Sequence, residues 1–198
     1  MNPMTIAEAI EKAMAKLLGN KPPEPIISDD EVAQTIVRMA DQYGYEPSPE
    51  VVEPIRAYLA GYGLLLSGDT GSGKTFLMHC LGGRQYTCER IIEYGMVNVH
   101  QWFEWTDGYE VVLDDLGVER TVSEYGAKDE IMKTVIGHRC ERQSARTHVT
   151  TNLKAEQIAE RYGDRTLSRL TGMCKAFRID GRSRRRPMAM NNQRARAT

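Results

Sequence analysis

The residue types with the clearest chemistry lie in one run with the spacing G-x-x-x-x-G-K-[ST]. Glycines in such a run let the backbone bend so that its N–H groups point at the phosphates of a nucleotide. Lys74 would place a positive charge near the β- and γ-phosphates, and the Thr75 hydroxyl would bind Mg²⁺. The predicted cradle consists of Gly68, Asp69, Thr70, Gly71, Ser72, Gly73, Lys74 and Thr75, followed by Phe76.

The flanking segments decide whether this run is a nucleotide site or only a glycine-rich turn. Residues 64–67 are Leu-Leu-Leu-Ser, which predicts a strand, and residues 75–81 continue with helical periodicity. Phosphate binding requires this order of strand, loop and helix, and the helix directs its positive end at the same phosphates. We therefore expect a nucleotide site here.

Paired carboxylates follow a second apolar run, residues 109–113, which predicts a buried strand. Asp114 suits a water-bridged contact with Mg²⁺, and Asp115 is the candidate to polarise an attacking water. Two aspartates can also simply end a strand at the surface, but their combination with the cradle favours a metal site. Asn152, after a predicted strand at 147–151, could hold the same water, although an asparagine there is often only a turn residue.

Two arginines, Arg165 and Arg169, are four residues apart and so share one face of a predicted helix. At a subunit boundary, one of them would reach the γ-phosphate of the neighbouring subunit as an arginine finger in trans. The alternative is a pair of surface arginines with local carboxylate partners. Among residues 182–186, one arginine could reach the phosphates in cis while the others are only solvated.

Alternating strand and helix patterns surround these residues and predict an α/β fold, with a mostly parallel sheet and its ligand at the carboxyl ends of the strands. The strand after the cradle helix is ambiguous between residues 90–92 and 96–99. The aromatic residues beside it are expected in the core or an interface, with base stacking as the alternative. They are Trp102, Phe103 and Trp105.

Three predicted helices precede the cradle strand, because capping boxes begin at Thr5 and Ser28 and a proline follows Ser48. Residues 1–20 form one amphipathic helix, a candidate docking element for a partner, with packing in cis as the alternative. The proline-rich residues 21–27 predict a linker. The domain boundaries that follow are 28–186 for the nucleotide-binding domain and 187–198 for a basic tail.

Composition places the chain among globular proteins, with 198 residues, 41% hydrophobic and 27% charged. No apolar run approaches the roughly 20 residues of a membrane span, so we expect a cytoplasmic protein without a membrane partner. Four cysteines without C-x-x-C pairing are expected as reduced thiols. The net charge of −1 conceals a basic last third, in which residues 138–198 carry 15 basic and 5 acidic side chains. Phosphate or nucleic acid is the expected partner of that charge, with a solvated tail as the alternative.

Five motifs together resemble the DnaC/IstB branch of the AAA+ ATPases, which includes bacterial and phage helicase loaders. They occur in the order of that family at residues 68–75, 112–119, 150–153, 162–170 and 181–185. The resemblance implies a three-layer P-loop NTPase that binds ATP and Mg²⁺ and hydrolyses ATP. It also implies assembly with itself on single-stranded DNA, to deliver a replicative helicase or, as in IstB-like helpers, to assist a transposase.

The resemblance also assigns roles to particular residues. Lys74 and Thr75 take the Walker A positions and Asp114 with Asp115 the Walker B pair. Further along the chain, the sensor 1 position falls on Asn152, the arginine-finger position on Arg169 with Arg165 close by, and the sensor 2 position on Arg185.

Two departures from the family pattern qualify the expectation. Only residues 76–113 separate the cradle from the carboxylates, so the helical insert that loaders use on single-stranded DNA is expected to be reduced. The sequence ends soon after Arg185, so no full helical lid domain is expected.

Two other classes of function fit a phosphate-binding chain of this length. A small-molecule P-loop kinase would need an acceptor pocket and a lid, which no pattern here predicts. A nucleotide-dependent switch would bind its partner according to the nucleotide while barely hydrolysing it.

Overall fold

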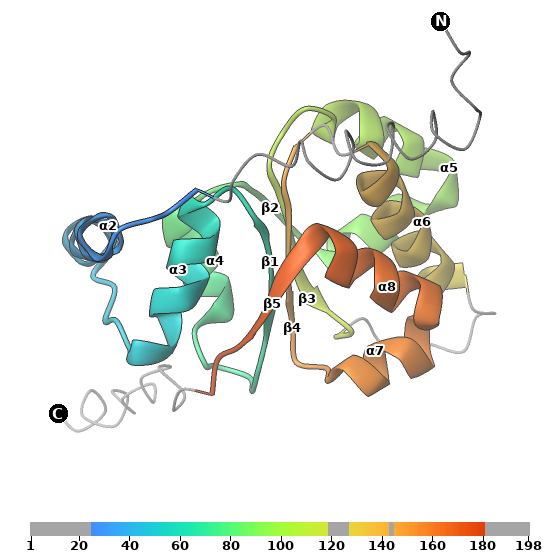
Figure 1. Ribbon diagram of the computed structural model, residues 1–198. Helices are drawn as coiled ribbons and strands as arrows, with labels where there is room; N and C mark the ends of the chain where they lie inside the picture. The colour runs from blue at the N-terminus through green and yellow to red at the C-terminus, as the bar shows by residue number, and fades with distance from the viewer. Residues whose placement is uncertain (1–24, 119–126, 143–144, 181–198) are drawn as a thin grey trace, which may run out of the picture.

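A five-stranded, all-parallel sheet forms the centre of the molecule (Figure 1). The computed structural model describes residues 25–118, 127–142 and 145–180. The predicted helix at 1–20, Arg185 and the tail at 187–198 lie outside these residues. The strand order is β2-β3-β4-β1-β5. The strands are β1 (Gly63–Ser67), β2 (Arg84–Thr87), β3 (Val111–Leu116), β4 (Thr147–Thr151) and β5 (Cys174–Arg178).

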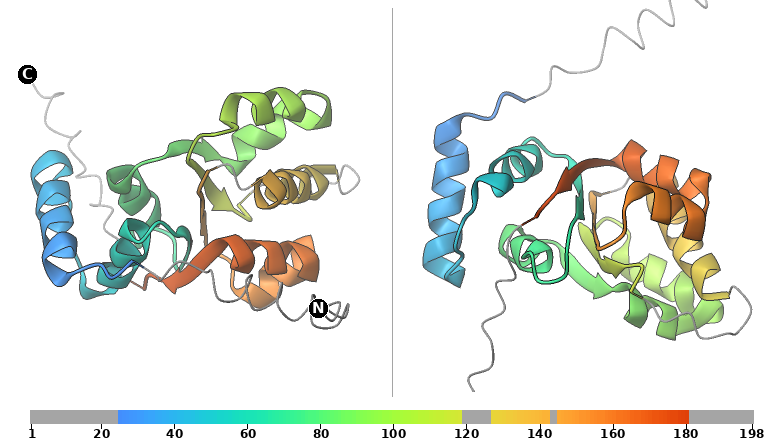
Figure 2. Two further views of the ribbon diagram at one scale, coloured as in Figure 1. Left: turned by 45° about the horizontal axis from the view of Figure 1, so that its top comes forward. Right: turned by 90° about the horizontal axis from the view of Figure 1, so that it is seen from below.

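Helices cover both faces of this sheet, as Figures 1 and 2 show. One layer contains α3 (Val52–Leu59) and α4 (Lys74–Leu81), with α2 (Asp29–Tyr43) packed on its outer side. The other layer contains α5 (Cys88–Thr106), α6 (Ala127–Arg142), α7 (Ala155–Tyr162) and α8 (Asp164–Met173). The predicted three-layer α/β fold with a parallel sheet is confirmed.

Side-chain alternation along β1 explains why both faces are covered. Leu64 and Leu66 pack into the apolar cluster under α2, α3 and α4, whereas Leu65 packs into the cluster under α5 to α8. Successive side chains of a strand point to opposite faces, so an uninterrupted leucine run needs an apolar layer on each side.

Local signals set the ends of the first helices as the sequence predicts. The Ser28 side chain accepts a hydrogen bond from the Glu31 N–H, and the Glu31 carboxylate accepts one from the Ser28 N–H at 2.8 Å. This reciprocal capping box begins α2, and Gly44 ends it in the left-handed conformation with φ of 63°. Pro49 begins a short 3-10 helix (Pro49–Val51) that leads into α3.

The prediction for the second strand was wrong. Residues 90–92 and 96–99 both belong to α5, and the strand is the preceding β2. Ile91 before the kink at Gly95, and Val99 and Trp102 after it, are fully buried, so they lie on the inner face of α5. β2 lies at the edge of the sheet and is mostly exposed, so its sequence Arg-Gln-Tyr-Thr lacks the apolar run that marks a buried strand.

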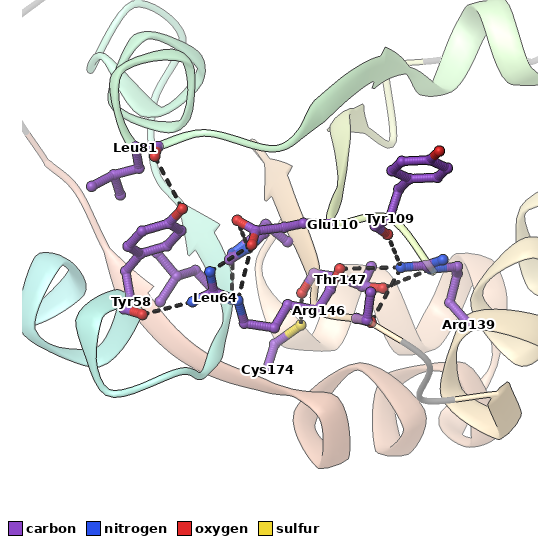
Figure 3. A network of polar contacts seen from close by, with 11 residues as sticks. Tyr58, Leu64, Leu81, Tyr109, Glu110, Arg139, Arg146, Thr147 and Cys174 are labelled. Carbon is purple, nitrogen blue, oxygen red and sulfur yellow. Dashed lines mark hydrogen bonds and ion pairs between the residues drawn. The ribbon is translucent and has the colours of Figure 1, made fainter. Parts of the chain in front are cut away.

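A network of polar contacts joins the amino ends of the central strands (Figure 3). Arg146 donates to Glu110 Oε2 at 3.0 Å through Nε and to the Tyr58 carbonyl at 2.7 Å through Nη1. His148 Nδ1 accepts from the Leu64 N–H at 3.1 Å. Its proton is therefore on Nε2, which lies 3.0 Å from Glu110 Oε1 and donates to it.

A buried arginine ties the same edge to the second helix layer (Figure 3). Arg139 on α6 donates to the Thr147 hydroxyl at 2.9 Å, and its remaining donors reach backbone carbonyls, among them those of Thr106 and Tyr109. Because all parallel strands begin at this edge, their carboxyl ends meet at the opposite edge, where the predicted site residues lie.

Candidate active site

The loop between β1 and α4 bends through glycines in backbone conformations that other residues rarely adopt. The φ angles are 143° at Gly68, 86° at Gly71 and 97° at Gly73. A Cβ atom at Gly68 would overlap the carbonyl oxygen of Ile179, whose N–H donates to Ser67 at 2.8 Å. The loop is thus shaped by its own glycines and by the segment that follows β5.

Lys74, the first residue of α4, points into this loop and is only 5% exposed. Its ammonium group donates to the carbonyl oxygens of Gly68 at 2.8 Å and Asp69 at 2.9 Å. It also donates to Asn152 Oδ1 at 2.9 Å. Burial lowers the pKa of Lys74, and neighbouring carboxylates, first that of Asp115, oppose this shift. One cation thus joins the loop to the end of β4.

One carboxylate oxygen of Asp114, on β3, accepts hydrogen bonds from two hydroxyl groups. Thr75 donates to its Oδ1 at 2.9 Å and Thr150 donates to it at 2.6 Å. Asp114 is only 6% exposed. Its carboxylate is held beside the loop by these two protein donors. Hydroxyl and carboxylate oxygens are the ligands that Mg²⁺ prefers.

Asp115 occupies a β-bulge between β3 and β4. Leu113 pairs with Val149 and Leu116 pairs with Thr151, so two residues of β3 stand opposite Thr150 alone. Asp115 has φ of 59°, and no other non-glycine residue among those described has a positive φ. The bulge lets both aspartates lie at the carboxyl edge of the sheet, whereas strict alternation would turn them to opposite faces.

Aromatic rings stand beside the loop on the α2 side. Phe76 is 39% exposed, and its ring centroid lies 5.7 Å from that of Tyr45 and 6.4 Å from that of His79. An exposed ring one residue beyond Thr75 offers an apolar surface next to the phosphate loop.

The two predicted finger arginines lie in the other helix layer. Arg165 and Arg169 border a groove of about 710 Å³ formed by α5, α6 and α8. Arg169 donates to Glu141 on α6 at 2.8 Å and lies so close to Gly137 that a Cβ atom there would meet its guanidinium group. The structure therefore gives Arg169 the local carboxylate partner of the alternative interpretation, and α4 with Lys74 lies across the sheet (Figure 1).

The predicted loop, both aspartates and Asn152 thus come together, whereas Arg165 and Arg169 lie apart from them. Thr150 was missed by the sequence reasoning, as was the bulge that it faces. Thr150 falls within the family motif at residues 150–153, but four of the five residues of β4 are polar, so polarity does not single it out in the sequence.

The donor set fits a nucleotide with its Mg²⁺ better than a dedicated metal cage. Among the described residues, no group of three or more His, Cys, Asp or Glu side chains could hold a metal ion. Mg²⁺ is commonly bound through one or two carboxylates together with substrate phosphates, and Thr75 with Asp114 provides such a partial set. No helix in the described part of the chain is long and apolar enough to cross a membrane.

Comparison with known proteins gives matches among solved structures. No protein-family model matches the chain, and no curated protein does. A crystal structure of the DnaC helicase loader is 23% identical, with a TM-score of 0.57, and the match covers 70% of this chain and 95% of that chain.

DnaA structures match less of their own length. AMPPCP-bound DnaA from Aquifex aeolicus is 12% identical over 68% of this chain and 48% of that chain, with a TM-score of 0.53. Replication initiator DnaA bound to AMPPCP and single-stranded DNA is 12% identical over 69% of this chain and 48% of that chain, with a TM-score of 0.52. At these identities the likeness shows the fold: the chain has the AAA+ P-loop NTPase fold of the DnaC helicase loader.

Proposed function

We propose that this chain, which has the AAA+ fold of the DnaC helicase loader, binds ATP with Mg²⁺ and hydrolyses it as one subunit of an assembly. The observation that carries the proposal is the pair of contacts that Lys74 makes with Asn152 and Thr75 makes with Asp114. These contacts join the phosphate loop to the ends of β3 and β4, where hydrolysis needs a metal ligand and a group that orients water.

In this proposal each residue has one task. Lys74 and the loop N–H groups bind the phosphates, and Thr75 with Asp114 holds Mg²⁺, which when bound neutralises charge on the phosphates. Asp115 orients the attacking water and accepts its proton, and Asn152 fixes the position of that water. Phe76 packs against the nucleotide base, and Arg185 would have the sensor 2 role toward the phosphates.

Arg169 would supply the remaining positive charge to the site of a neighbouring subunit, with Arg165 beside it. The argument for trans action is the position of α8, because Arg169 contacts Glu141 of α6 on the side of the sheet opposite α4 (Figure 1). The pair with Glu141 does not oppose this role, since the Glu141 side chain is 70% exposed and such surface ion pairs contribute about 1 kcal/mol or less.

The cellular role that we propose is to load or remodel a replicative helicase on single-stranded DNA in the cytoplasm. Support comes from the fold of a helicase loader, from the DnaA structure that holds single-stranded DNA, and from the basic last third of the chain. The amphipathic segment at 1–20 is the proposed contact for the helicase. A transposase in place of the helicase is the IstB-like alternative.

The test is ATP turnover per chain, measured against protein concentration with and without single-stranded DNA. Turnover should rise with both, because each site needs a neighbour. Arg169→Ala should lower it about 10³-fold while ATP still binds, since arginine fingers act on the transition state. Arg165→Ala tests the adjacent arginine, and Arg38→Ala, which removes an exposed arginine from α2, is the charge control.

Turnover indifferent to concentration, DNA and Arg169 would overturn the assembly mechanism. Turnover only with an added acceptor would then identify a kinase. Nucleotide-dependent association without turnover would identify a switch.

A further inference from the structure

We infer that Thr150 is a positioning residue that sets the geometry of both aspartates for the proposed ATP hydrolysis, on which this inference rests. Thr150 lies near the carboxyl end of β4, the central strand of the sheet, and is fully buried. Its hydroxyl group donates to Asp114 Oδ1 at 2.6 Å and accepts from the Asp115 N–H at 2.9 Å. One side chain therefore contacts both members of the carboxylate pair.

The hydroxyl group is needed at this position for these two bonds and not for the strand. β4 is central in the sheet and buried at every residue, an environment that favours valine, which has the shape of threonine. A buried hydroxyl without partners costs about 1–3 kcal/mol. At Thr150 both the donor and the acceptor are used, so its polarity is compensated only through Asp114 and Asp115.

The bond to Asp115 holds the bulge in place. The pairing of β3 with β4 leaves Asp114 and Asp115 opposite Thr150, and the Asp115 N–H points to the threonine side chain. Asp115 has φ of 59°, a conformation that costs a non-glycine residue about 1–2 kcal/mol. The hydrogen bond from the Asp115 N–H to the Thr150 hydroxyl offsets part of this cost. It also fixes the backbone of Asp115 and therefore the direction of its carboxylate.

The bond to Asp114 orients the carboxylate that faces Thr75. Two hydroxyl donors on one oxygen, from Thr75 and Thr150, fix the rotation of the carboxyl group. Thr150 donates from within the sheet, whereas Thr75 belongs to the phosphate loop. The sheet can thus hold Asp114 independently of the loop.

The experiment compares Thr150→Val with Thr150→Ser. Valine keeps the shape and removes both bonds, whereas serine keeps the hydroxyl. Thr150→Val should lower kcat by about 10–100-fold, the usual effect of removing a group that orients a metal ligand, with little change in KM. It should also raise the Mg²⁺ concentration needed for half-maximal binding of a fluorescent non-hydrolysable ATP analogue by about the same factor. Thr150→Ser should stay within about threefold of the native chain in both.

Thr147→Val is the matched control, because it makes the same substitution at the other end of the same buried strand. Its hydroxyl accepts from Arg139, away from the aspartates. Thr147→Val should lower the free energy of unfolding while kcat and the Mg²⁺ requirement stay native. Hydrogen exchange gives a readout independent of activity: the Asp115 amide should lose protection in Thr150→Val and keep it in Thr150→Ser and Thr147→Val.

The outcomes separate this inference from the proposed function. A native chain that fails to bind the analogue with Mg²⁺ would overturn both. A native chain that binds and hydrolyses ATP, together with a folded Thr150→Val variant of native kcat and Mg²⁺ requirement, would overturn the role of Thr150 alone. Equal loss of kcat in Thr150→Val and Thr147→Val would also overturn it, because the effect would then follow stability.

Discussion

At the scale of single residues, the phosphate loop depends on a glycine for two separate reasons. Gly68 has φ of 143°, and a side chain there would also overlap the Ile179 carbonyl. Gly68→Ala should therefore lower the free energy of unfolding by about 3 kcal/mol, from backbone strain and overpacking together. It should also weaken ATP binding, because relief of the overlap moves the loop. Urea denaturation and nucleotide titration measure the two effects.

A second glycine separates strain from overlap. Gly61 has φ of 90°, and a Cβ atom there would meet nothing within 4 Å. Gly61→Ala should cost only about 1–2 kcal/mol and leave ATP binding unchanged. Equal losses of stability in the two variants would show that the contact between Gly68 and Ile179 does not constrain the loop.

At the scale of the elements, the network of Glu110, Arg146 and His148 makes the starts of the central strands sensitive to acid. Burial alone would raise the pKa of Glu110, but hydrogen bonding by His148 and the charge of Arg146 bring this pKa down to about 2. Burial lowers the pKa of His148 below its ordinary value of 6.5. In both cases the unfolded chain takes up a proton at higher pH than the folded protein does.

Stability should therefore fall as the pH falls, in two windows. The stabilisation that depends on neutral His148 is lost as the pH falls below about 6.5. The stabilisation that depends on ionised Glu110, at most about 3 kcal/mol at neutral pH, is lost between about pH 5 and pH 2. Glu110→Gln should flatten the lower window and reduce stability at neutral pH. The measurement is the free energy of unfolding by urea from pH 3 to pH 8. Glu104→Gln, at an exposed position on α5, is the control, and an identical slope in Glu110→Gln and native protein would contradict the assignment.

The elements also show which parts of the fold the sequence could predict. Helices with clear ends were found where caps and glycines predicted them, as at Ser28 and Gly44. The edge strand β2 was not, because an exposed parallel strand has no apolar run and α5 contains the apolar residues nearby. The helix α5 is also kinked at Gly95, with φ of 70°, and this kink interrupts the helical period in its sequence.

Within the site, residues defined by spacing were predictable and those defined by pairing were not. Lys74, Asp114 and Asn152 follow from motifs and strand ends, and the structure brings them together. The bulge at Asp115 depends on the register between β3 and β4, which alternation within one strand does not encode. Thr150 could be recognised only once that register was known.

At the scale of the whole molecule, the two halves of the proposed catalytic machinery lie on opposite sides of the sheet. The phosphate loop begins α4 on one side of the sheet, and Arg169 contacts α6 on the other (Figures 1 and 2). If Arg169 acts in trans, the loop side of one subunit must meet the α8 side of the next. Such a head-to-tail contact gives a ring when the rotation closes and an open helix when it does not.

Mixing two inactive variants tests this arrangement directly. Lys74→Ala lacks the cation of its own site but keeps Arg169, whereas Arg169→Ala has the converse defect, so each alone should show almost no turnover. In an equimolar random assembly, about a quarter of the contacts between subunits pair an intact loop with an intact arginine, and turnover should recover to about a quarter of the native value. Replacing Lys74→Ala in the mixture by the double variant Lys74→Ala/Arg169→Ala should abolish the recovery. Absence of recovery in a mixture that still assembles would exclude action of Arg169 in trans and leave it either to the site of its own subunit or to its contact with Glu141 on α6.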